Sequence, residues 1–412
     1  MTHILEGIKI VDLSQVAAVP MAARHLADFG ADVIHVEPPH TGDSWRSFRP
    51  GSSIYETPGS DIPADGYIDH NWENYNRNKR SIILDLSQAE GKEIIHKLIS
   101  EADVFMTNQR LYEREKFGLE YETLHEKYPR LIYGSLTGYG KKGPEKNNPA
   151  YDVTSYWTKA GTSHLFSMPE LPPFIDGGGF GDNVAGISLA FGLMMALFGR
   201  EKSGVGQEVD LSLFHTGIYQ LTFFLAGTIA TGRDYRDWAI RSREEKKNVL
   251  DMPYETKDGR WLLLAMPQPE RWWPRFCHAI GREDLEHDPR FESFESRIEN
   301  RDILFEILKD TFLTRTLVEW KPALSGIPFA PYQNLLEVIE DPQAKANDIF
   351  VELNHPTHGL MKVIDSPVKL SENPATMRRF APEFGQHTEE VLLECGYTWE
   401  DISKFKEQGI VE

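Results

Sequence analysis

Cysteine and basic residues are the first scarcities in this 412-residue sequence. Its only two cysteines, Cys277 and Cys395, lie far apart and have no CxxC pattern around them. Neither a disulfide framework nor a zinc site is predicted, and we expect a reducing, cytoplasmic location. The 44 Lys and Arg residues are outnumbered by 63 Asp and Glu residues, which gives a net charge of −19. This excess argues against a nucleic acid as partner, although a local basic patch could still bind an anionic substrate.

Long apolar runs are also missing. The longest, Val184 to Phe198, has 15 residues, fewer than a helix needs to cross a bilayer. Residues 1–7 contain neither a basic stretch nor an apolar core, so we expect no signal peptide and no membrane association. The chain is long enough for two domains with a sizeable core.

Strand-like and helix-like segments alternate through the first half of the chain. Ile8–Leu13 and Asp32–Glu37 are apolar strands, and residues 16–29 between them have helical spacing that ends at Gly30. This order predicts a βαβ unit, whose two strands lie parallel in one sheet. Further strands are expected at 81–86, 104–107 and 131–136, and further helices at 87–99 and 121–127.

Local signals refine this pattern. Residues 38–76 are rich in Pro, Gly, Ser and Asp and are expected to form a long loop. Ser87 and Glu90 have the spacing of a capping box at the start of a helix. In the second half, the pair Asp258-Gly259 predicts a tight turn between two short strands.

The composition changes after about residue 232, where a highly charged stretch begins. We therefore expect residues 1–232 to form the first part of a large α/β domain. Residues 233–330 are expected to form a linker and a small domain, and residues 331–412 to return to the large domain and end in helices.

The stretch 177–183, Gly-Gly-Gly-Phe-Gly-Asp-Asn, carries the strongest chemical signal. Its glycines, among them Gly178, Gly179 and Gly181, clear side-chain bulk from around one carboxylate, Asp182. Backbone N–H groups and a helix start can stabilise negative charge there, so Asp182 is a candidate nucleophile. The local sequence alone favours a simpler role, in which Asp182 caps the helix that follows.

Two common motifs are absent. The turn after the first strand, residues 14–18, lacks the GxG of a dinucleotide-binding loop, and no GxSxG occurs. Basic residues instead gather near the expected strand ends, where open α/β sheets bind ligands. They are Lys79, Arg80, Arg110, Arg114, Lys116, Lys141 and Lys142.

Short motifs follow one another along nearly the whole chain. They are LEGIKIVDL at 5–13, ADVIHVEP at 31–38, GD at 42–43 with Arg46, NKRS at 78–81, ADV at 102–104, GYG at 138–140 with GP at 143–144, GD at 181–182, REKSGVGQ at 200–207, GIP at 326–328 and HTEEVL at 387–392. In this order they resemble the class III CoA-transferases, the formyl-CoA transferase-like family. The segment 143–152 is most similar to the branch that activates aryl and branched 2-hydroxy acids such as phenyllactate.

The resemblance implies a large Rossmann-like α/β domain with a parallel sheet and a smaller α+β domain, in an interlocked homodimer. It aligns Asp182 with the family's catalytic aspartate. The CoA contacts that it implies are Val16, Ala18, Leu84, Asn108, Arg110 and Lys116. Candidate substrate or oxyanion contacts are Gln15, Tyr151, Gly178, Gly179 and Gly181.

The resemblance also implies a reaction. Asp182 attacks an acyl-CoA thioester to give an anhydride, then an aspartyl thioester, which a free carboxylic acid captures. An ordinary Asp has a pKa of about 3.9, so we expect Asp182 to be ionised near neutral pH without special tuning. CoA is then a co-substrate, and neither a permanently bound cofactor nor a metal is expected.

The nature of the acid is suggested by departures from the formyl-CoA branch, which has Gln where this chain has Ala17 and Arg where it has Pro38. These differences argue against oxalate or formate. An aryl, branched 2-hydroxy or dicarboxylic acid is expected instead. The aromatic residues near the glycine stretch favour a bulky acyl group. Packing in the core would explain these aromatic residues as often. The aromatic residues are Tyr156, Trp157, Phe166, Phe174 and Phe180.

Two alternatives remain open. The same fold hosts 2-methylacyl-CoA racemases, which pair the aspartate with the His of a Gly-His-Asp motif about 30 residues upstream. Here that motif is Ala150-Tyr151-Asp152, which favours a transferase over a racemase or epimerase. The chain is alternatively one subunit of a heteromeric CoA-transferase, paired with a paralogue.

Overall fold

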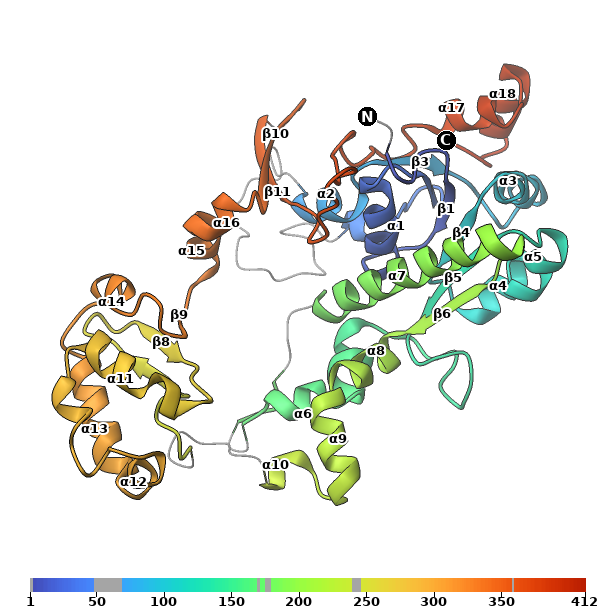
Figure 1. Cartoon of the computed structure of the whole chain (residues 1–412). Coiled ribbons are helices and arrows are strands. Elements are labelled where there is room, and N and C mark those ends of the chain that lie inside the picture. The colour runs from blue at the N-terminus through green and yellow to red at the C-terminus, as the bar shows by residue number, and fades with distance from the viewer. Residues whose placement is uncertain (1–2, 48–68, 169–170, 175–178, 239–245, 358) are drawn as a thin grey trace. The chain divides into compact units, whose positions relative to one another are not determined.

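The computed structural model describes residues 3–47, 69–168, 171–174, 179–238, 246–357 and 359–412. The chain divides into two compact units (Figure 1). Unit 1 comprises Met1–Phe224 and Asn347–Glu412, and unit 2 comprises Leu225–Ala346. The domain boundaries expected from the composition stay a prediction.

Unit 1 is built on a six-stranded sheet with the order β3-β2-β1-β4-β5-β6. The strands are β1 Lys9–Leu13, β2 Asp32–Glu37, β3 Lys79–Ile83, β4 Val104–Thr107, β5 Ile132–Thr137 and β6 Glu208–Ser212. All five neighbouring pairs are parallel, as the βαβ pattern predicted. The carboxyl ends of β1 and β4 therefore meet at one edge, where an α/β sheet of this kind binds ligands.

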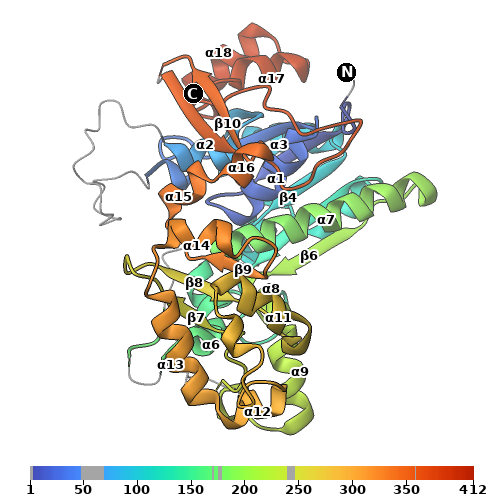
Figure 2. The same cartoon turned by 60° about the vertical axis from the view of Figure 1, so that its left-hand side comes forward.

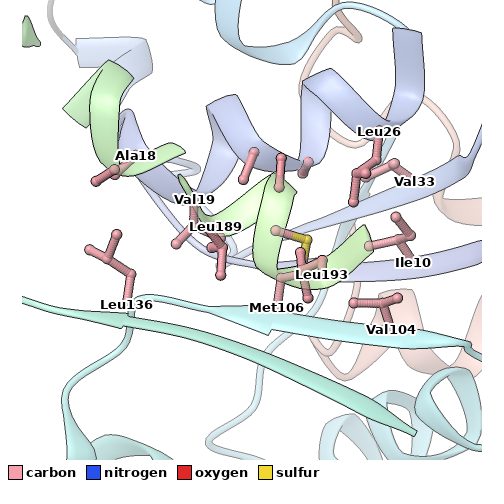
Figure 3. Packing of buried hydrophobic residues seen from close by; sticks show 14 of the residues in the cluster. Ile10, Ala18, Val19, Leu26, Val33, Val104, Met106, Leu136, Leu189 and Leu193 are labelled. Atoms are coloured by element: carbon pink, nitrogen blue, oxygen red, sulfur yellow. The ribbon is translucent and has the colours of Figure 1, made fainter. Parts of the chain in front are cut away.

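Helices cover both faces of this sheet because its strands alternate their side chains. Ile10 of β1 faces a core shared with α1 and α7, whereas the adjacent Val11 faces a core shared with α3, α5, α17 and α18. Figure 3 shows the first of these cores, with Val19 of α1 and Leu189 of α7 above the sheet. The helices of unit 1 are α1 Ala18–Asp28, α2 His70–Asn76, α3 Ala89–Ser100, α4 Leu111–Phe117, α5 Tyr121–Lys127, α6 Thr162–Phe166, α7 Phe180–Ser203, α8 Leu213–Gln220, α17 Thr388–Glu394 and α18 Trp399–Glu407.

Shorter elements complete unit 1. A 3-10 turn spans Ser44–Ser47 and a π-helical turn spans Val153–Lys159. The antiparallel pair β10 Phe350–His355 and β11 Gly359–Ile364 precedes α17.

The apolar run is part of α7, which begins at Phe180 and extends to Ser203. By length and composition alone α7 could cross a membrane, and 44% of its most apolar window is buried inside the chain. α7 lies along α1 in both Figure 1 and Figure 2, and Leu193 and Ala196 are buried against the sheet. We therefore interpret α7 as a core helix, whose apolar character serves packing.

Three local predictions were wrong. The stretch 38–76 is not loop throughout: its last turns form α2, because Asp69 accepts a hydrogen bond from the Trp72 N–H at 2.8 Å and caps a helix there. Ser87 does not cap α3, which begins after Gln88; its N–H instead donates to Asp85 Oδ1 at 2.9 Å. Asp182 does not cap α7, since Gly179 occupies that position with φ +81°.

Unit 2 has its own core around a three-stranded antiparallel sheet, β7-β8-β9. The predicted Asp258-Gly259 turn joins β7 to β8, with Gly259 at φ +70°. Trp320 and Phe276 are fully buried at the centre of this core. Its elements are β7 Pro253–Glu255, β8 Trp261–Leu264, α11 Pro269–Ile280, a 3-10 turn Glu283–Leu285, α12 Phe294–Glu299, α13 Arg301–Phe312, α14 Leu317–Ala323, β9 Phe329–Pro331, α15 Leu335–Glu340 and α16 Pro342–Ala346; α9 Thr222–Thr231 and α10 Tyr235–Trp238 precede them.

Candidate functional site

A cavity of about 510 Å³ lies at the carboxyl ends of β1, β4 and β5 in unit 1. It brings together six of the residues predicted from sequence: Gln15, Val16, Asn108, Arg110, Lys116 and Tyr151. A neighbouring cavity of about 160 Å³ is lined by Leu84 and shares Gln15 and Phe117 with the first. Two adjoining cavities of this kind suit an elongated ligand that crosses the ends of several strands.

Ala18 and Asp182 line neither of these two cavities. Ala18 is the first residue of α1 and is buried in the core, so its side chain contributes to packing. Gly178 lies outside the described residues. The two cavities therefore bring together only some of the contacts that the family resemblance implies.

The turn from β1 to α1 forms one wall of the larger cavity. Val16, at its centre, has φ +70°, a conformation that a β-branched residue seldom adopts and that costs about 1–3 kcal/mol. Asn108 fixes the preceding residue, because its Oδ1 accepts from the Gln15 N–H at 3.0 Å and its Nδ2 donates to the Gln15 carbonyl at 2.7 Å. The Val16 N–H donates to Asp43 Oδ1 at 3.0 Å. A strained turn held by two side chains presents a defined surface to a ligand.

Two cations face the cavity from α4. Arg110 precedes the helix and Lys116 lies in its last turn, and both side chains are exposed. Each cation lies 5.4 Å from an aromatic ring centroid, Arg110 near Tyr112 and Lys116 near Phe117. They form a local basic site in a chain of net charge −19, which suits an anionic ligand.

Other members of the predicted basic group have structural partners. Lys79 is fully buried and donates to Asp12 at 2.9 Å, and Arg80 donates to Asp32 at 2.6 Å. Arg114 is buried and donates to the Gln109 carbonyl at 2.7 Å. The sequence pattern cannot distinguish these cations from Arg110 and Lys116, because their role depends on burial.

Asp182 lies in the first turn of α7 and is half-buried. The N–H of Gly181 donates to Asp152 Oδ2 at 3.2 Å, which brings a second carboxylate to this helix start. A Cβ at Gly181 would lie 2.2 Å from Asp152 Oδ1 and 2.3 Å from Tyr156 Cγ, so only glycine fits there.

The expectation of an ordinary, untuned Asp182 was wrong. Burial raises the pKa of Asp182, and the Asp152 carboxylate raises it further, to about 7. Loss of hydration and repulsion by a like charge both disfavour the ionised form. A carboxylate whose pKa lies near the operating pH at a helix start is a functional-site candidate on physical grounds.

Aromatic side chains cluster around Trp157, and one of them, Phe180, is the first residue of α7. Trp157 is buried at the centre of the cluster, and its ring centroid lies 6.2 Å from that of Phe166, 5.7 Å from Phe174 and 5.6 Å from Phe180. The three phenylalanines are 46–60% exposed. This half-open aromatic surface begins at Phe180, two residues before Asp182.

Sequence reasoning missed two acidic residues of the site. Asp152 entered only as part of a motif, and Asp43 only as part of a matched GD pair, although each contacts a residue predicted for the site. The GD pair was the available signal for Asp43, but nothing in the sequence shows that it reaches Val16.

The chain is similar to known proteins along nearly its whole length. Residues 5–388 match the family model described as CoA-transferase family III. The chain is 36% identical to (R)-2-hydroxy-4-methylpentanoate CoA-transferase of Clostridioides difficile, with 99% of each chain covered. It is 34% identical to cinnamoyl-CoA:phenyllactate CoA-transferase of Clostridium sporogenes, over 98% of this chain and 96% of the relative. A crystal structure of a CAIB/BAIF family protein from Brucella suis has a TM-score of 0.80 and 27% identity, and covers 96% of this chain and 100% of that one.

Proposed function

Because the chain belongs to CoA-transferase family III and is a CoA-transferase, we propose that it activates an aryl or branched 2-hydroxy acid with Asp182 as the nucleophile. The observation that carries the proposal is the position of Asp182, in the first turn of α7 with its pKa near 7. CoA is the co-substrate, and the donor is an acyl-CoA thioester.

In the proposed reaction the ionised Asp182 attacks the thioester carbonyl and forms an acyl-aspartyl anhydride while CoA leaves as a thiolate. The thiolate attacks the aspartyl carbonyl, the first acid departs and an aspartyl-CoA thioester remains. The second carboxylic acid attacks this thioester, giving a new anhydride and CoA thiolate. Attack of the thiolate on the new acyl carbon releases the product thioester and restores Asp182.

The surroundings of Asp182 support these steps. Each tetrahedral intermediate carries an oxyanion, and hydrogen-bond donors aimed at it contribute about 3–4 kcal/mol each in enzymes of known mechanism. Backbone N–H groups near Gly179 and the start of α7 are the candidate donors, because the helix dipole favours negative charge there. The Gly181 N–H is already donated to Asp152, so we assign it a supporting role.

The larger cavity is the proposed CoA site. Its cations Arg110 and Lys116 suit the phosphates of CoA, and the turn at Val16 forms its wall. Leu84, in the adjoining cavity, is proposed to contact the nucleotide end of the same ligand.

The acyl group is proposed to contact the aromatic cluster of Trp157, Phe166, Phe174 and Phe180. An aryl or branched acyl group gains more from such a surface than formate would. Two relatives, named for a 4-methylpentanoate and for phenyllactate, support this choice.

Assembly and location are also part of the proposal. Exposed apolar residues on α7, among them Phe191, Met195 and Phe198, suit a subunit interface, and we propose the interlocked homodimer. Pairing with a paralogue is the alternative. Transfer activity of this chain purified alone distinguishes the two, since a homodimer is active without a second subunit. Cys277 and Cys395 are free and buried, in keeping with the proposed cytoplasmic location.

The nucleophile is tested by trapping. Wild-type protein is incubated with acyl-CoA and treated with hydroxylamine or borohydride, and the modified peptide is identified by mass spectrometry. We expect label on Asp182, and a loss of transfer of at least about 1,000-fold in Asp182→Ala and Asp182→Asn. Transfer by Asp182→Ala within tenfold of wild type would refute the mechanism. A panel of acyl-CoAs and free acids identifies the substrates in the same assay.

A further inference from the structure

The turn at Val16 is held in a strained backbone conformation. Val16 lies between β1 and α1, lines the larger cavity and has φ +70°. A β-branched side chain is disfavoured in this left-handed region, so the turn would relax if it were not held. The conformation persists only if surrounding groups over-determine it.

Asp43 is the side chain that holds Val16. Its Oδ1 accepts hydrogen bonds from the Val16 N–H at 3.0 Å and from the Trp45 N–H at 2.8 Å. Its Oδ2 lies 3.3 Å from the same Val16 nitrogen. Asp43 is fully buried, so these contacts are shielded from water and each is stronger than it would be at the surface.

A buried carboxylate needs a counter-charge, and His35 of β2 supplies it. His35 Nε2 lies 3.4 Å from Asp43 Oδ2, and His35 Nδ1 lies 3.1 Å from Asp12 Oδ2. Burial alone would lower the pKa of His35, but the Asp12 charge and the contacts with both carboxylates raise it to about 9. The protonated imidazole lies between the two carboxylates, with Nδ1 toward Asp12 and Nε2 toward Asp43.

The line of buried charges is balanced at its far end by Lys79, whose Nζ donates to Asp12 Oδ2 at 2.9 Å. Two cations, Lys79 and His35, thus compensate two carboxylates, Asp12 and Asp43. The four side chains are fully buried and come from or follow β1, β2 and β3. A rigid sheet therefore anchors Asp43, and through it the cavity wall.

We propose that Asp43, held by His35, is a positioning residue that fixes the β1–α1 turn in the shape that binds CoA. This rests on the proposed CoA site. Without the Asp43 carboxylate, Val16 relaxes toward negative φ and the wall of the cavity moves. CoA affinity falls, whereas the chemical step at Asp182 is little changed, because the turn contributes to uniform binding.

The test uses Asp43→Ala and Asp43→Asn, each alone and combined with Val16→Gly. Measurements are the Kd of CoA by titration calorimetry, KM and kcat of transfer, and the melting temperature. Asp43→Ala is expected to raise Kd and KM about tenfold, equivalent to about 1.4 kcal/mol, with kcat within threefold. Asp43→Asn keeps an acceptor for the Val16 N–H but turns a donor toward His35, so a smaller rise, of about threefold, is expected.

Val16→Gly distinguishes positioning from a general loss of stability. Glycine adopts φ +70° without a steric cost. In that background, Asp43→Ala should therefore raise Kd by less than threefold, and Asp43→Asn should leave it unchanged. If Asp43→Ala does not fold, the Asn pair gives the same comparison.

Asp28→Asn serves as the matched control. Asp28 is also buried and ion-paired, with Arg24 at 2.8 Å and Arg77 at 2.9 Å, but it lies at the far end of α1 from the cavity. It should lower the melting temperature and leave Kd unchanged. Equal effects of the Asp43 variants in both backgrounds, or an equal rise in Kd for Asp28→Asn, would overturn the proposal. Wild-type protein that binds CoA without transferring it would refute the proposed function and leave this positioning role intact.

Discussion

Asp152 and Gly181 join two distant segments at the start of α7, where the Gly181 N–H donates to Asp152 Oδ2 at 3.2 Å. Through this contact, one backbone N–H at the start of α7 binds a carboxylate of the protein itself. It also brings the Asp152 charge close enough to raise the pKa of Asp182. The candidate nucleophile is therefore tuned by a residue 30 positions earlier in the chain.

Transfer should depend on pH through the ionisation of Asp182. Burial and the Asp152 carboxylate raise the pKa of Asp182 to about 7. Only the ionised carboxylate is nucleophilic, and it predominates only above that pH. We expect kcat/KM for the acyl-CoA to rise about tenfold per pH unit below 7 and to level off above it. A pH–rate profile from 5 to 9 measures this. A flat profile down to pH 5 would show that Asp182 titrates like an ordinary Asp.

Asp152→Asn should move this profile to lower pH. The amide oxygen of Asn can still accept the Gly181 N–H, but the negative charge that opposes ionisation of Asp182 is gone. We expect the midpoint of kcat/KM to fall below 7, while burial keeps it above the ordinary value near 3.8. Asp210→Asn is the control: Asp210 of β6 accepts from Ser135 Oγ at 3.2 Å, and its replacement should leave the midpoint in place. An unshifted midpoint in Asp152→Asn contradicts the electrostatic coupling.

The tuning of Asp182 should cost stability. Between its ordinary pKa and about 7 the folded state holds a proton that the unfolded state has released, so stability falls as the pH rises through this window. Asp182→Asn cannot ionise and should exceed the wild type in free energy of unfolding at pH 8, by up to about 4 kcal/mol. The advantage should vanish near pH 4. Urea unfolding at both pH values measures it, and a difference of equal size at the two would refute the linkage.

Arg110 and Lys116 should contribute to CoA affinity through charge. The double alanine variant is expected to raise KM for acyl-CoA about five- to tenfold with kcat little changed, since both cations are exposed at the cavity. The effect should shrink as salt rises. Alanine at Lys309 and Lys345, which pair with Glu306 and Glu340, removes the same charge from unit 2 and serves as control. An unchanged KM at low ionic strength would place CoA elsewhere.

Tyr151 should distinguish transfer from racemisation. Its side chain is 62% exposed at the cavity, and it carries a phenol where the racemase motif has an imidazole. We expect wild-type protein to catalyse transfer without exchanging the α-proton of the acyl group. Proton NMR in heavy water measures this exchange. Tyr151→His introduces an imidazole and should gain slow exchange at the expense of transfer. Rapid exchange by the wild type would assign the chain to the racemase class.

Local signals were sufficient for most of the framework. β2, β4 and α5 have the bounds predicted for them, because alternation and helical spacing act within a few residues. The capping box predicted at Ser87 does not form, because the Ser87 N–H donates a hydrogen bond to Asp85 instead. The glycine stretch located Asp182, but its role as a cap was excluded only by the conformation of Gly179.

The sequence by itself determined the parallel α/β framework, the family and the position of the candidate nucleophile, because these follow from periodicity and ordered motifs. Only the tertiary structure decided the chemical state of the site. The pKa of Asp182 depends on burial and on Asp152, and the shape of the turn at Val16 depends on Asp43. Charge interactions and hydrogen bonds act through space, between segments that the fold brings together and that the order of residues leaves far apart.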